Sequence, residues 1–61
     1  MNAEQYNLSQ QILQLQAQYA QLVVSAQSEN DLDRLREMML ERNSLVRTVN
    51  ELRAKLNESA S

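Results

Sequence analysis

Acidic side chains in the second half of the chain are the first candidates for chemistry. Glu37 and Glu41 stand four residues apart, so on a helix both carboxylates would lie on one face and could contact a metal ion. The chain has no His and no Cys, which excludes imidazole and thiolate ligands as well as a Ser-His or Cys nucleophile. A pair of helices also offers no enclosed cavity for a substrate. We therefore predict no enzyme activity, no metal site and no cofactor.

Basic side chains are the second candidates, as contacts for nucleic acid. They are Arg34, Arg36, Arg42 and Arg47. Acidic residues lie between them, at Asp33, Glu37 and Glu41, and the chain has a net charge of −2. Because nucleic-acid binding depends on basic surface, we do not expect nucleic acid as a partner. An RNA-binding four-helix dimer stays open as one alternative function.

The composition predicts an all-α protein that forms one domain over residues 1–61. The chain has no Gly and no Pro, which sheets with tight turns would require. Its commonest residues, such as Leu, Gln, Glu, Arg and Ala, favour helices. No apolar run reaches the ~18 residues of a membrane span, and no signal peptide is evident. We expect a cytoplasmic protein that does not interact with a membrane.

Two apolar series with heptad spacing run along the chain, and their phases differ. From Ala26 in the first series to Leu35 in the second there are nine residues instead of seven. Two extra residues rotate an apolar stripe by about 200°, so one seam cannot serve both series. We predict an antiparallel, coiled-coil-like hairpin with helices over about 3–26 and 31–57, a turn at about 27–30 and a frayed tail at 58–61. One long helix of about 80 Å in a coiled-coil dimer is the alternative fold.

Polar residues predict where each helix begins. Asn2 can cap the first helix, with Gln5 at capping-box spacing. Ser28 or Asn30 can cap the second helix. Because the turn has no Gly, Asn30 is the residue expected to accept a left-handed conformation there.

Two helices cover only one stripe on each other, so we expect the hairpin to form a homodimer, an antiparallel four-helix bundle. Arg42 interrupts the stripe of the second helix, and Leu32, Met39 and Val46 widen it. The predicted oligomer core consists of Leu8, Ile12, Leu15, Tyr19, Leu22, Leu35, Met38, Leu45, Val49, Leu52 and Leu56.

The first helix carries a second apolar row about 150° from its core stripe. This row, called here the outer row, is made of Tyr6, Leu13, Ala17, Ala20 and Val24. Of all charged side chains, only Glu4 lies in residues 1–28, so the first helix is nearly neutral. Two interpretations are open: the outer row is further core of a homo-oligomer, or it binds a different protein.

Parts of the chain resemble known families. Residues 31–46 resemble flagellar export chaperones, which are small helical bundles that bind the termini of secreted subunits. The overall layout is similar to the plasmid-copy-number RNA-binding hairpin proteins and to small phage-encoded inhibitors that form helical-hairpin dimers. These resemblances imply binding functions.

From these observations we predict a non-enzymatic protein-binding module: a small adaptor, export chaperone or inhibitor. It would dock by helix packing, with the outer row as the candidate partner surface. A purely structural coiled-coil oligomerisation segment is the alternative.

Overall fold

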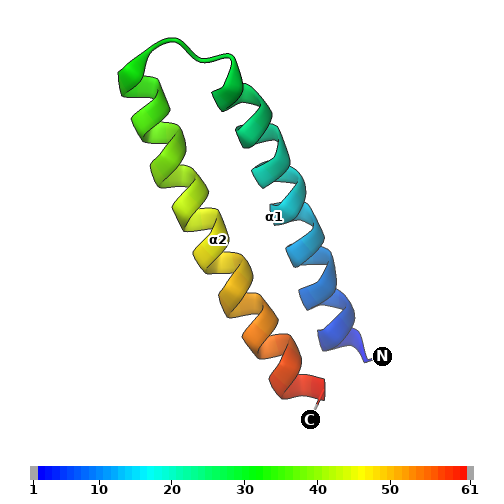
Figure 1. Cartoon of the computed structure of the whole chain (residues 1–61). Helices are drawn as coiled ribbons and strands as arrows, with labels where there is room; N and C mark the ends of the chain where they lie inside the picture. The colour runs from blue at the N-terminus through cyan, green and yellow to red at the C-terminus, as the bar shows by residue number, and fades with distance from the viewer. Residues whose placement is uncertain (1, 61) are drawn as a thin grey trace.

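Two antiparallel helices pack side by side along their whole length (Figure 1). In the computed structural model, α1 spans Ala3–Gln27 and α2 spans Leu32–Ala60. The structure describes residues 2–60, and of residue 60 only the backbone. The hairpin prediction is confirmed, and the single long helix is wrong because the molecule measures 45 × 15 × 11 Å. Within the described part, neither helix combines the length and the apolar character needed to cross a membrane.

The start of α1 is fixed by the predicted capping box. The Asn2 side chain accepts a hydrogen bond from the backbone N–H of Gln5 at 2.8 Å. In return, the Gln5 side chain accepts one from the backbone N–H of Asn2 at 3.3 Å. Two N–H groups that lack helical partners are thereby satisfied, which confirms this prediction.

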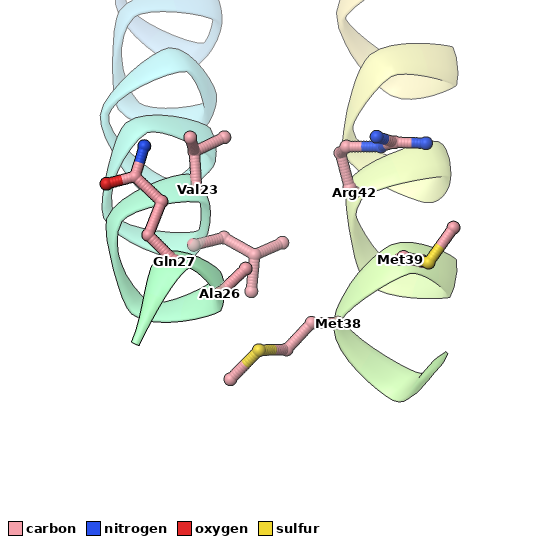
Figure 2. A pocket seen from close by; sticks show the side chains of 7 residues that line it. Val23, Ala26, Gln27, Met38, Met39 and Arg42 are labelled. Atoms are coloured by element: carbon pink, nitrogen blue, oxygen red, sulfur yellow. The ribbon is translucent and has the colours of Figure 1, made fainter. Parts of the chain in front are cut away.

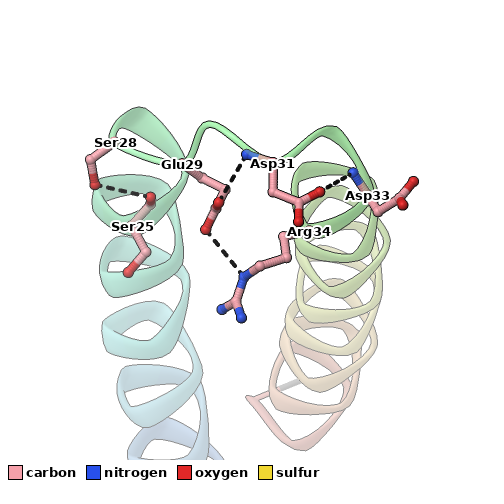
Figure 3. Close-up of polar contacts among 6 residues, drawn as sticks. All are labelled: Ser25, Ser28, Glu29, Asp31, Asp33 and Arg34. Atoms are coloured by element: carbon pink, nitrogen blue, oxygen red, sulfur yellow. Dashed lines mark hydrogen bonds and ion pairs between the residues drawn. The ribbon is translucent and has the colours of Figure 1, made fainter.

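The end of α1 closes without a left-handed residue. The backbone N–H and the hydroxyl of Ser28 both donate to the Ser25 carbonyl, each at 3.3 Å (Figure 3). The next N–H, that of Glu29, donates to the Ala26 carbonyl at 3.3 Å. No residue within 2–60 has a positive φ angle, so the left-handed conformation expected at Asn30 is wrong. The Ser28 hydrogen bonds close the last turn of α1 instead.

Asp31 caps α2, which corrects the prediction of Ser28 or Asn30. Its carbonyl accepts from the N–H of Leu35 at 3.0 Å, and its carboxylate accepts from the N–H of Asp33 at 2.9 Å (Figure 3). Asp31 takes this role because it directly precedes Leu32, the first helical residue, whereas Ser28 is already used at the end of α1. The turn therefore occupies residues 28–31, one position later than predicted.

The end of α2 also differs from the prediction. The helix continues to Ala60, so the expected end near Asn57 is corrected, and positions 58–60 are helical where a frayed tail was predicted. The last turn of α2 lies beside the first turn of α1 (Figure 1), where the Ser59 hydroxyl donates to the Glu4 carboxylate at 3.2 Å. This contact gives the last turn a fixed neighbour. The final predicted tail position, 61, lies outside the described residues.

The core is a single seam between α1 and α2. Its buried side chains, each 8–9% exposed, are Leu8, Ile12, Leu45, Val49 and Leu52. Leu15 and Leu56 pack against this cluster. Other predicted core residues are only half-buried, namely Leu22, Leu35 and Met38. Tyr19 is 37% exposed, which places its ring at the margin of the seam and not inside it. Whether these residues also form an oligomer core stays a prediction.

Candidate interaction surface

The outer row of α1 is open to solvent along its full length. Tyr6 is 57% exposed, Leu13 56% and Val24 65%, and both Ala17 and Ala20 are exposed as well. The reason is geometric, because α2 covers one stripe of α1 and the outer row lies about 150° from it. No side chain of the described residues is fully buried, so the hairpin has no second layer that could cover this row.

A second open surface lies along one side of the seam, near the turn. A hollow of about 270 Å³, the first hollow, lies between the two helices. It is lined by Leu22, Val23, Ala26, Gln27, Met38, Met39 and Arg42. Met38 extends from α2 toward α1, and Ala26 faces it from the other wall (Figure 2). The lining is mostly apolar, with Arg42 as its one charged side chain.

A second hollow of about 220 Å³ lies farther from the turn. It is lined by Gln16, Tyr19, Leu45, Val46, Val49, Asn50 and Arg53. Met39 in the first hollow, and Val46 and Arg53 in the second, follow each other at seven-residue steps, which keeps them on one side of α2. The two hollows therefore lie on the same side of the seam, and together they are called here the groove.

The opposite side of the seam is acidic. A shallow depression there is lined by Gln18, Gln21, Leu22, Ser25 and Glu41. At about 100° per residue, the carboxylates of α2 fall within an arc of about 100° that is turned away from the groove. They belong to Asp33, Glu37, Glu41, Glu51 and Glu58. No carboxylate lines either hollow of the groove.

The four arginines considered as contacts for nucleic acid do not share one surface. The Arg34 guanidinium donates to the Glu29 carboxylate at 3.1 Å at the turn, where Glu29 also accepts from the Asp31 N–H at 3.0 Å (Figure 3). Arg42 lines the groove and donates to the Asn43 side chain at 3.2 Å. The helical register turns Arg36 and Arg47 to the side of α2 that faces away from α1. Four arginines on three surfaces do not make the continuous basic strip that RNA binding would use.

The second helix exposes more apolar surface than its stripe suggested. Leu32 is 78% exposed, Met39 53% and Val46 43%, although the pattern placed them beside the core. One neighbouring helix cannot cover so wide a stripe, so Met39 and Val46 border the groove, whereas Leu32 lies outside its lining. From the sequence, the seven-residue spacing of these three residues indicates only that they share one side of α2.

The spacing of Glu37 and Glu41 makes them candidate metal ligands. Among residues 2–60, no three Asp or Glu side chains gather closely enough to hold a metal ion. Glu37 and Glu41 share one side of α2, as expected from their spacing, without a third ligand.

Comparison with protein-family models, with curated proteins and with solved structures finds no match for this chain. The resemblances to export chaperones, RNA-binding hairpins and phage inhibitors therefore stay predictions.

Proposed function

We propose that this protein is a non-enzymatic interaction module of the cytoplasm that binds proteins, including a second copy of itself, by helix packing. The observation that carries this proposal is the outer row of α1. It presents Tyr6, Leu13 and Val24, each more than half exposed, on a helix with no charged neighbour beyond Glu4. An exposed apolar row of this kind on a small protein is typical of an interaction surface.

The exposed area of the hairpin supports this proposal. Its accessible surface is 4817 Å², whereas a compact monomer of 7.1 kDa exposes about 4,100 Å². The difference, roughly 700 Å², approaches the ~800 Å² that each partner buries in a standard interface. If the hairpin buries one such surface in a complex, its remaining accessible area would be close to that of a compact monomer of the same mass.

An adaptor, an export chaperone and an inhibitor could all use the outer row by the same mechanism. A partner helix packs along α1, and its anchors follow i, i+3, i+4 and i+7 spacing. Homodimerisation into a four-helix bundle uses the same packing, with helices crossing at about 20°. Ala17 and Ala20 favour a purely structural role as the second candidate, because small side chains let two helices approach closely along the outer row.

Two neighbouring substitutions in α1 test the proposal. Leu13→Asp places a charge in the outer row, and Gln14→Asp places the same charge at an exposed position outside it. We expect Leu13→Asp to abolish self-association in sedimentation equilibrium, or the capture of cellular proteins by cross-linking, while circular dichroism stays helical. Gln14→Asp should retain both.

Loss of the dimer in Leu13→Asp assigns the outer row to a second copy, and loss of capture alone assigns it to another protein. Leu15→Asp serves as the unfolding reference, because Leu15 packs on the buried cluster and cannot accept a charge there. Wild-type behaviour of Leu13→Asp in both measurements would contradict the proposal.

A further inference from the structure

The groove combines apolar walls with positive charge. Each hollow has one arginine in its lining, Arg42 in the first and Arg53 in the second. Its other polar residues are the neutral Gln16, Gln27 and Asn50. Met38 and Met39 in the first hollow are unbranched and adapt to irregular surfaces.

The rest of the hairpin strengthens this charge difference. All five carboxylates of α2 lie on the arc turned away from the groove. The one carboxylate of α1, that of Glu4, accepts a hydrogen bond from Ser59 at the far end of the hairpin. The turn carboxylates of Glu29 and Asp31 accept from Arg34 and from the Asp33 N–H, and neither lines a hollow of the groove. The groove is therefore a cationic surface on a chain whose net charge is negative.

We propose that the groove binds one acidic amphipathic helix of another protein. This inference rests on the proposed function and names the chemistry of the partner. Met39 and Val46 are seven residues apart, which on α2 is about 10 Å, or two helical turns. Apolar side chains at i and i+7 of the partner helix enter the two hollows, and carboxylates beside them pair with Arg42 and Arg53.

The positive charge of the groove argues against a second copy of this chain as its occupant. Two grooves placed face to face would bring four arginines together with no carboxylate in either lining. Like charges that meet across an interface cost several kcal/mol, so the groove is not complementary to itself. The nearly neutral outer row of α1 carries no such penalty and is the better surface for a second copy.

Two synthetic peptides test the inference by fluorescence anisotropy. Both form a helix of about five turns with Leu at i, i+4, i+7 and i+11. One peptide carries Glu on the flanks of the Leu row, and the other carries Lys. We expect the Glu peptide to bind the wild-type protein about tenfold more tightly at low salt, with the difference shrinking at high salt.

Charge reversal provides the decisive variant. Arg42→Glu combined with Arg53→Glu should invert the preference, so that the Lys peptide binds more tightly. The matched control is Arg36→Glu combined with Arg47→Glu, which changes the net charge equally on the side of α2 away from α1. This control should keep the preference for Glu. A second matched pair tests the apolar wall, because Met39→Asp should weaken binding whereas its exposed neighbour Leu40→Asp should not.

Four results would overturn the inference. If both peptides bind equally, or if Arg42→Glu with Arg53→Glu leaves the preference unchanged, the groove does not select an acidic partner. The proposed function would still stand in either case. Binding of neither peptide overturns the inference, and the outer-row variants then decide the proposed function separately. A wild-type dimer that Val46→Asp dissociates, while Leu40→Asp does not, would give the groove to a second copy.

Discussion

The half of the hairpin near the chain ends is packed more tightly than the half near the turn. Leu8, Ile12, Val49 and Leu52 form the buried cluster on the chain-end side. On the turn side the facing residues Leu22 and Met38 are only half-buried, and the first hollow lies between the helices there. The difference shows that heptad spacing in both helices does not by itself produce an evenly packed seam.

Two features explain the looser half. Arg42 stands where the stripe of α2 calls for an apolar residue, and Ala26 supplies little side-chain volume on the wall that faces Met38. Burial contributes about 25 cal/mol per Å² of apolar surface, so the tighter half supplies most of the stability of the seam. The looser half buries less apolar surface, and its hollow leaves room for a partner side chain.

The largest expected effect separates the two halves directly. Leu52→Ala should lower the free energy of unfolding by about 2–3 kcal/mol, because it leaves a gap in the buried cluster. Leu22→Ala, in the looser half, should cost about 1 kcal/mol, since less of its surface leaves solvent on folding. Urea denaturation followed by circular dichroism at one protein concentration measures both. Equal losses would show that the two halves are equally tight in solution.

A smaller effect concerns the turn. Asp31→Ala removes the side-chain cap of α2 and should lower the free energy of unfolding by about 1 kcal/mol. The control is Asn30→Ala, an exposed turn residue outside the observed cap, which should change it by less than about 0.5 kcal/mol. Thermal unfolding distinguishes the two variants. A larger loss in Asn30→Ala would restore Asn30 as the cap.

The smallest expected effect has the opposite sign. Arg42→Leu should raise the free energy of unfolding by about 0.5 kcal/mol, because a Leu side chain extends the apolar stripe into the first hollow. Leu and Arg have similar helix propensity, so a change in stability reports packing. Denaturation under the same conditions as for Leu52→Ala provides the measurement. A loss of stability would mean that the Arg42 stem and its bond to Asn43 support the turn half.

Local patterns were predictable from particular residues. Asn2 and Gln5 form their capping box within one turn of helix, so their spacing alone sufficed. The phase change between Ala26 and Leu35 predicted the hairpin, because no single seam can follow a stripe that rotates by about 200°. The cap of α2 was harder, since Ser28, Asn30 and Asp31 are all good caps and the choice depends on where α1 stops.

The sequence by itself determined two antiparallel helices, their core stripes and an apolar outer row on a nearly neutral α1. These follow from the periodicity of side chains along each helix, which is a local property. The tertiary structure alone decided that Tyr19 lies at the margin of the seam and that Met39, Val46 and Arg53 line a groove with it. The reason is that burial and groove formation depend on the position of one helix along the other. That position depends on where α1 ends, where α2 begins and how the side chains of the seam pack between them.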